Sequence, residues 1–327
     1  MLKEGIILKK YTLIAAIIAT VLLFSSCGLI PDYNFGYIDK TGNFVIEPQF
    51  DNAYPFSEGM APVMIGFSEY SKWGYIDKTG KLVIEYKYDK VRGFYEGLSP
   101  VMEEDKWTFI DKQGNKAIDA EYLDASIFNK GMAPVKFTDS KKYGYIDPEG
   151  NAVMDSTFSI ASIFSEDLAI YGVGTPDNAL IGIINRKGDI VVEAKYATCS
   201  SYKEGLSAFK ISKEEVSDWG YMDTEGNIVI EPSFAWALSF SEGLAAVQVD
   251  NTMNGKWGYI NKQGDFVIEP VFDSAASFSE GLAAVMVEDK NGSLWGYIDK
   301  SGKFVIEPKF IVAYDFSEGL APASMED

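Results

Sequence analysis

The stretch W-G-Y-I-D-K-S-G-K-F-V-I-E-P-K-F-I-V-A-Y-D-F-S-E-G-L-A, residues 295–321, decides the fold, because close copies of it fill most of this 327-residue chain. The second position of the motif recurs at intervals of 38, 34, 36, 38, 38, 38 and 38 residues. It is occupied by Gly36, Gly74, Thr108, Gly144, Gly182, Gly220, Gly258 and Gly296. Such a period indicates a repeat array, in which a unit buries its apolar face only against its neighbours. We therefore expect one domain of eight units over residues 35–327.

Each copy reads as three β-strands joined by short connections. The first strand, 295–299, is rich in aromatic and β-branched residues, and the following D-K-x-G predicts a type I turn with a G1 bulge. A second strand is expected over 303–307, ending at Pro308, which has no N–H for a ladder. The three-residue spacing of Phe310, Ala313 and Phe316 predicts one helical turn with a single buried face. The third strand then begins at Leu320.

The two ends of the array leave two architectures open. The array begins with a W-G-Y-I-D strand and ends with an L-A strand at 320–324, and such a pair could close a propeller-like ring through a shared blade. Propeller blades usually have four strands, however, and an open stack absorbs units of different length more easily. We therefore predict an all-β, open β-superhelix of three-stranded meanders, with the closed propeller-like ring as the alternative.

The near-verbatim recurrence of G-Y-I-D-K-x-G and F-S-E-G-L-A resembles the WG-repeat (KWG-repeat) family. This family occurs largely in bacterial proteins, many of them exported or lipid-anchored. The resemblance covers essentially all of residues 35–327. It implies a β-repeat domain that serves in binding or assembly and has no defined reaction.

The N-terminal residues have the organisation of an export signal. Three lysines precede an apolar stretch at 13–24, which is shorter than the roughly 20 residues of a membrane span. The run F-S-S-C-G at 24–28 resembles a bacterial lipobox, in which the chain is cut before the cysteine and lipid is attached to its thiol. We therefore expect a lipoprotein signal peptide at 1–26, a lipidated Cys27 with a short linker at 27–34, and an exported protein held on the bacterial cell envelope by its lipid.

Composition narrows the chemistry. The chain has 48 Asp+Glu, 29 Lys+Arg and no histidine, so its net charge of −19 argues against nucleic acid, and the commonest general base and zinc ligand is absent. We interpret the repeated Asp of Y-I-D as a turn cap and the repeated Glu of V-I-E as a partner of neighbouring backbone. A catalytic carboxylate pair needs two different environments, which a repeated position does not offer. We therefore expect no enzyme activity, no metal and no cofactor.

Binding residues are sought where the units differ, because the recurring W-G aromatics are expected in the core. Trp236 occupies a position that holds a different residue in most other units and is therefore a binding candidate. Cys199 falls where most other units have alanine and is expected to be a small buried residue. The loops that lead into the next W-G vary most, and the longest adds Tyr171, Asp177 and Asn178 to the candidates.

Together these observations predict a non-enzymatic, lipid-anchored envelope protein whose repeat surface binds or scaffolds another envelope protein. The alternative is a surface glycan-binding module that uses exposed aromatic residues such as Trp236. The two hypotheses differ in whether aromatic side chains line a groove at the variable loops.

Overall fold

The computed structural model describes residues 34–66, 71–175, 178–212, 218–250, 255–290 and 292–325. The expected signal peptide and Cys27 lie outside the described residues. The repeats form one compact unit, Asn34–Asp327. Within its described residues, no helix has the length and apolar character needed to cross a membrane.

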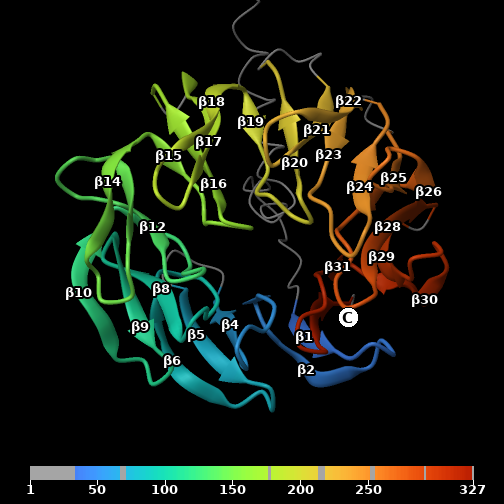
Figure 1. The fold of residues 1–327 in the computed structure, drawn as a ribbon. Coiled ribbons are helices and arrows are strands. Elements are labelled where there is room, and N and C mark those ends of the chain that lie inside the picture. Colours follow the sequence, from blue (N-terminus) through green and yellow to red (C-terminus); the bar gives the residue numbers. More distant parts are fainter. Residues whose placement is uncertain are drawn as a thin grey trace, which may run out of the picture. The chain divides into compact units, whose positions relative to one another are not determined.

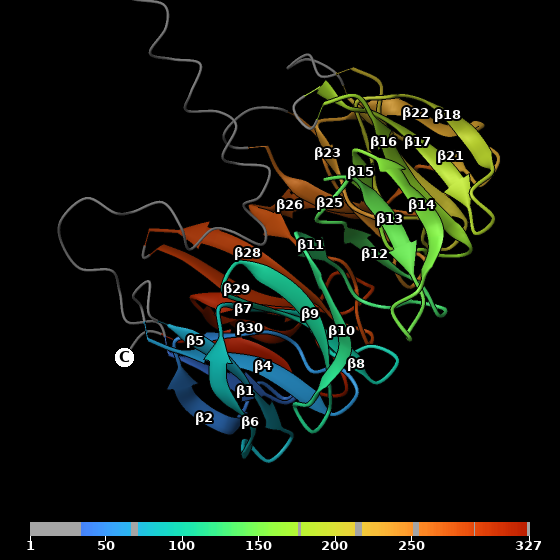
Figure 2. The same cartoon turned by 90° about the vertical axis from the view of Figure 1, so that its left-hand side faces the viewer.

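The described residues build eight four-stranded antiparallel sheets, which stand as blades around a ring (Figures 1 and 2). The closed propeller-like ring is therefore confirmed, and the open superhelix that we favoured over it is not the observed arrangement. From the inner to the outer strand, blade 1 consists of β31 (Val312–Ala313), β32 (Ala321–Ser324), β1 (Phe35–Ile38) and β2 (Phe44–Phe50). The short inner strand lies nearest the centre of the ring.

The other seven blades follow in chain order with the same inner-to-outer sequence of strands. Blade 2 is β3 (Asn52–Ala53), β4 (Met60–Ile65), β5 (Lys72–Asp77) and β6 (Leu82–Tyr88); blade 3 is β7 (Lys90–Val91), β8 (Leu98–Glu103), β9 (Lys106–Asp111) and β10 (Lys116–Tyr122). Blade 4 is β11 (Asp124–Ala125), β12 (Ala133–Lys136), β13 (Tyr143–Ile146) and β14 (Ala152–Phe158); blade 5 is β15 (Ile160–Ala161), β16 (Leu168–Val173), β17 (Leu180–Asn185) and β18 (Ile190–Tyr196). Blade 6 is β19 (Thr198–Cys199), β20 (Leu206–Lys210), β21 (Trp219–Asp223) and β22 (Ile228–Phe234); blade 7 is β23 (Trp236–Ala237), β24 (Ala245–Gln248), β25 (Trp257–Ile260) and β26 (Phe266–Phe272). Blade 8 is β27 (Ser274–Ala275), β28 (Ala283–Asp289), β29 (Gly292–Ile298) and β30 (Phe304–Phe310).

Each repeat unit contributes to two blades. Its W-G-Y-I-D and V-I-E strands form the outer half of one blade, and its short strand and L-A strand form the inner half of the next. Blade 1 consequently takes its inner strands from the last unit and its outer strands from the first. Phe35 pairs with Ser324 and Ile38 pairs with Ala321, so the ring closes through the shared blade that the closed alternative requires.

Two local predictions are wrong. Phe310, Ala313 and Phe316 are all buried, as expected, but the chain between them forms the two-residue strand β31 and no helical turn. Its backbone bonds to β32 instead, with Ile311 N–H donating to the Ser324 carbonyl at 2.9 Å. The second strand also continues through Pro308 as far as Phe310, because β30 is an outer strand on which a missing N–H is tolerated.

The recurring aromatic residues form the packing between blades. The tyrosines of G-Y-I are fully buried, and Tyr221, for example, donates its hydroxyl to the Leu238 carbonyl of the next blade at 2.8 Å. The tryptophans of W-G are buried as predicted at Trp73, Trp107, Trp219 and Trp257, whereas Trp295 is half-buried. The glycine beside them permits close strand approach, since a Cβ at Gly296 would lie 2.6 Å from the Ile306 carbonyl oxygen.

Candidate functional site

The ring has two unlike ends. One end, which we call the turn face, carries the D-K-x-G turns and the S-E-G turns, because Met60 pairs with Asp77 where these two turns meet in blade 2. The opposite end, the loop face, carries the variable loops, because Ile65 pairs with Lys72 at the last rung before such a loop. The same registers recur in the other blades, so the variable loops gather at one end of the ring.

The D-K-x-G turns on the turn face confirm the capping interpretation. Asp299 Oδ1 accepts the backbone N–H groups of Ser301 at 2.8 Å and Lys303 at 3.2 Å. Where the aspartate is replaced, Asn261 Oδ1 accepts the corresponding N–H of Gln263 at 2.9 Å. These bonds lower the pKa of Asp299, with the Ser301 side chain as the largest cause. These carboxylates therefore cap the turns.

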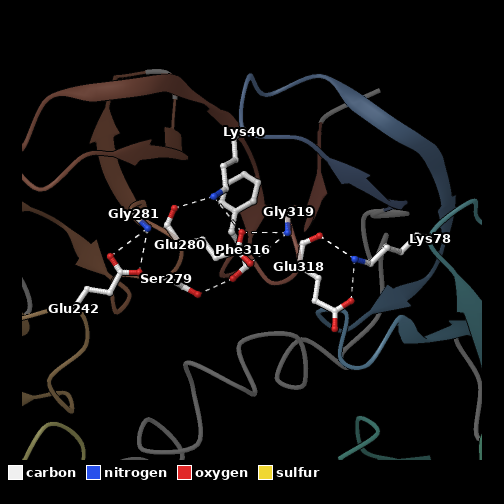
Figure 3. A network of polar contacts seen from close by, with 9 residues as sticks. All are labelled: Lys40, Lys78, Glu242, Ser279, Glu280, Gly281, Phe316, Glu318 and Gly319. Carbon is white, nitrogen blue, oxygen red and sulfur yellow. Dashed lines mark hydrogen bonds and ion pairs between the residues drawn. The ribbon is translucent and has the colours of Figure 1, made fainter.

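A second set of carboxylates on the turn face was not identified from the sequence. It belongs to the S-E-G turns and comprises Glu58, Glu96, Glu166, Glu204, Glu242, Glu280 and Glu318, which we call the glutamate ring. Each carboxylate accepts a backbone N–H from the turn of the next blade, as Glu280 does from Gly319 at 3.1 Å (Figure 3). The last member accepts the Gly59 N–H at 3.1 Å and so continues the series across the closure.

Lysines of the D-K-x-G turns form ion pairs with several of these glutamates. Each such lysine lies in the next blade, the one that also supplies the backbone N–H. Lys40 Nζ lies 3.1 Å from Glu280 Oε2 and donates to the Glu280 carbonyl at 2.9 Å (Figure 3). At the remaining junction, Lys130 replaces the glutamate and Asp167 replaces the glycine of the next turn, with 3.1 Å between Nζ and Oδ1. The polar groups of the ring are thus engaged in joining blades.

The glutamates of V-I-E have a different position from the one expected. Glu47, Glu307 and their equivalents are exposed on the outer strands. Within the described residues, their side chains make no bond to neighbouring backbone. That part of the interpretation is wrong: the repeated glutamates that accept backbone N–H groups are those of the S-E-G turns, and the N–H groups that they accept belong to the next blade.

The loop face contains a polar cavity of about 280 Å³ between blades 3, 4 and 5. Its lining residues come mainly from the short inner strands and the rungs beside the 137–142 loop. They are Arg92, Asp124, Ser126, Pro134, Lys136, Tyr143, Ser159, Ile160 and Ala161, and we call this the loop-face cavity.

A connected set of side chains shapes this cavity. Arg92 Nε donates to the Ala125 carbonyl at 2.9 Å, and its guanidinium lies 5.3 Å from the centre of the Trp107 ring. Asp124 Oδ2 accepts the Tyr143 hydroxyl at 2.6 Å, and Oδ1 accepts the Ala125 N–H at 2.9 Å. Burial and the bond to Asp124 raise the pKa of Tyr143, so its hydroxyl stays a donor.

Two further groups complete the cavity. Lys136 Nζ lies 5.7 Å from the centre of the Tyr143 ring. Ser159 is 8% exposed, and its Oγ has no hydrogen-bond partner within the described part of the chain. A buried hydroxyl without a partner is unfavourable, so Ser159 Oγ is an unsatisfied polar group in a residue of the cavity lining.

The fold does not bring together those predicted site residues that the structure describes. Trp236 is half-buried in blade 7, with its ring 5.3 Å from that of Trp219 in blade 6, so it packs between blades. Tyr171 is 3% exposed in blade 5 and lines a second cavity of about 510 Å³ beside Phe158. Asn178 is exposed on the loop after β16, and Asp177 lies outside the described residues.

Cys199 is half-buried, and burial raises the pKa of its thiol to about 12. Among the described residues, no group of three or more His, Cys, Asp or Glu side chains has a geometry for a metal ion.

Sequence reasoning also missed the loop-face cavity, although a signal was present. Arg92 is one of only two arginines in the chain, and it stands where the other units have Tyr54, Ser126, Ser162, Ser200, Leu238, Ala276 and Tyr314. The comparison between units that singled out Trp236 applies equally to Arg92. Its distance of 3.7 Å from Asp124 Oδ1 depends on the packing of two blades and is not indicated by the sequence.

Comparison with known proteins identifies the chain as a member of the WG containing repeat family. The family model matches residues 35–66, 73–107, 107–141, 143–174, 181–213, 219–252, 257–290 and 295–327. Among curated proteins, no sequence match is found.

Several solved structures of other proteins are similar to this chain at low sequence identity. The β-propeller domain of the Trilobed protease from Pyrococcus furiosus, described as having an open velcro topology, is 10% identical with a TM-score of 0.51, over 79% of this chain and 99% of that one. Porphyromonas gingivalis dipeptidyl peptidase 4 is 8% identical with a TM-score of 0.50, over 80% of this chain and 52% of that one. Hsv2 of Kluyvelomyces marxianus is 13% identical with a TM-score of 0.47, over 75% and 95% of the two chains.

Proposed function

We propose that this WG-repeat protein is exported to the bacterial cell envelope, held there by lipid on Cys27, and binds another envelope protein through its loop face without catalysing a reaction. The observation that supports this proposal best is the loop-face cavity. It joins side chains of three blades around a buried Ser159 Oγ that has no partner among the described residues.

The difference between the two faces supports a binding role for the loop face. On the turn face, the glutamate ring and the aspartate caps already bond to backbone of their own or the next blade. These repeated carboxylates therefore stabilise the fold, and their hydrogen-bonding capacity is used within the protein. The loop face carries the residues that differ between units, which is where repeat proteins usually place their binding residues.

The glycan-binding alternative has less support, because the rings of Trp236, Trp73 and Trp107 are already packed against other side chains. Trp236 packs on Trp219, and Tyr54 stacks on Trp73 with 4.7 Å between ring centres. Arg92 covers the ring of Trp107. A sugar face needs a bare aromatic platform, and these rings do not provide one.

Photo-crosslinking from defined positions tests the binding role. A photoreactive residue would replace the exposed Asp139 on the loop face, or the exposed Gln113 on the turn face as the matched control. We expect one defined envelope protein to be crosslinked in cells from position 139 and not from position 113. Crosslinks from neither position, or equally from both, would contradict the proposal.

The anchor is tested separately. Radiolabelled fatty acid should be incorporated into the wild-type protein and not into Cys27→Ser, which should also leave the membrane fraction. Equal labelling of the two proteins, or no labelling of the wild type, would refute lipid attachment at this residue.

A further inference from the structure

The loop-face cavity is lined by two cationic side chains and one carboxylate. Each carboxylate oxygen of Asp124 accepts one hydrogen bond, Oδ2 from the Tyr143 hydroxyl and Oδ1 from the Ala125 N–H. Arg92 NH2 is 3.7 Å from Asp124 Oδ1, an ion pair too long for a hydrogen bond, and Lys136 Nζ forms no ion pair among the described residues. The hydroxyls of Ser126 and Ser159 are the neutral polar groups of the lining.

The Arg92 guanidinium is also accessible from outside. The Arg92 side chain is 42% exposed, and its Nε bond to the Ala125 carbonyl holds the guanidinium in place without using its terminal nitrogens. Arginine held in this way suits a carboxylate, because its planar fork can donate two parallel bonds. Two cations against one carboxylate give the lining of the cavity an excess of one positive charge in a chain of net charge −19.

We propose that the loop-face cavity binds a side-chain carboxylate from an acidic peptide segment of the partner, with Arg92 and Lys136 as its charged donors and Ser159 as a neutral one. This inference rests on the proposed function and specifies its ligand. A volume of about 280 Å³ suits one acidic side chain and its immediate backbone. The rings of Trp107 and Tyr143 are occupied by cations, which favours a peptide carboxylate over the uronic acid of a glycan.

The test is an NMR titration of the intact repeat protein with acetyl-Gly-Glu-Gly-amide. Acetyl-Gly-Gln-Gly-amide is the isosteric neutral control, and glucuronate is the glycan-type control. We expect saturable shifts with the glutamate peptide, and binding at least about tenfold weaker for the glutamine peptide, because a charge-assisted fork is lost.

Variants locate the site. Arg92→Met and Lys136→Met should each weaken binding of the glutamate peptide about tenfold. Lys90→Met should leave it unchanged, because Lys90 is exposed on the neighbouring inner strand and does not line the cavity. Ser159→Ala separates loss of binding from loss of folding. It removes a hydroxyl that lacks a partner, so the melting temperature should not fall, whereas binding of the glutamate peptide should weaken.

Several outcomes would overturn the inference: equal binding of the two peptides, no binding of the glutamate peptide, unchanged binding in Arg92→Met, or binding of glucuronate alone. The inference and the proposed function fail in different ways. A partner crosslinked from position 139 together with no glutamate-peptide binding removes only the carboxylate ligand. Peptide binding without any crosslinked partner removes the proposed function and leaves the site.

Discussion

Glu242 offers a direct measure of what the glutamate ring contributes to stability. Its carboxylate accepts the Gly281 N–H at 3.0 Å and lies 3.0 Å from Lys300 Nζ, with 28% of the Glu242 side chain exposed (Figure 3 shows the bond to Gly281). A hydrogen bond to a charged group contributes about 1.5–3 kcal/mol when buried, and an exposed ion pair about 0.2–1 kcal/mol. After allowance for exposure, we expect Glu242→Ala to lower the free energy of unfolding by about 2 kcal/mol, and Glu242→Gln by about 1 kcal/mol.

The assay is urea and thermal unfolding followed by tryptophan fluorescence and circular dichroism. A loss of about 2 kcal/mol in a domain of this size corresponds to a melting temperature lower by roughly 4 °C. Glu231→Ala is the matched control, because Glu231 is exposed on the outer strand β22 and should change stability by less than about 0.5 kcal/mol. If Glu242→Ala and Glu231→Ala are equally stable, the glutamate ring does not join the blades energetically.

The same residue makes a signed pH prediction. Burial alone would raise the pKa of Glu242, but hydrogen bonds from Lys300 and Gly281 and the charge of Lys300 outweigh it and lower the pKa below its ordinary value. The folded pKa is therefore below the unfolded one. Its contribution is complete above the ordinary glutamate pKa of about 4.3 and is lost as the pH falls through the folded value. Glu242→Gln should accordingly lose less stability than the wild type on acidification below that pH.

Other contacts yield further tests. Lys130→Glu alone should lower the free energy of unfolding by about 0.5–1 kcal/mol, because the new carboxylate would face Asp167. Adding Asp167→Gly should restore stability, because the pair then matches the glutamate and glycine of the other junctions. A double-mutant cycle without coupling would contradict this. Tyr221→Phe should cost about 1–2 kcal/mol in denaturant unfolding, because the buried Leu238 carbonyl loses its donor, and an unchanged midpoint would count against that bond. The Cys199 thiol, with its pKa raised to about 12, should react with a thiol reagent at pH 8 far more slowly in the native protein than in urea; equal rates would show that burial does not protect it.

Much of the fold was predictable because its signals are local. The period of the repeat, the capping aspartates and the buried tyrosines of G-Y-I each depend on residues within one unit. The fourth strand was not predictable in the same way. Val312 and Ala313 form a strand only because β32 lies beside them. A three-residue spacing of buried positions occurs in a helical turn, and it occurs here along a segment that contains a short strand, so the spacing alone does not distinguish them.

The contacts between blades could not be predicted from the sequence for a related reason. Glu280 and Gly319 are 39 residues apart, and nothing in either unit alone indicates that their turns meet. Arg92, Asp124 and Ser159 come from three successive units and form one cavity only after three blades have packed. The candidate site was therefore sought at Trp236, whose departure from the repeat is obvious, while Arg92 departs as clearly and occupies the cavity.

The sharing of blade 1 between the two ends of the array has a consequence for how the chain acquires its structure. The outer strands β1 and β2 are made first, yet their inner partners β31 and β32 come almost 290 residues later. Until then the first hairpin has an open edge, and a two-stranded hairpin alone is marginal in water. This pairing has the largest sequence separation in the fold, so we expect it to be a late and slow step, as high contact order dictates. A ribosome-bound or truncated chain that lacks 312–324 should therefore leave the first hairpin exposed to proteases, although seven blades could already be assembled.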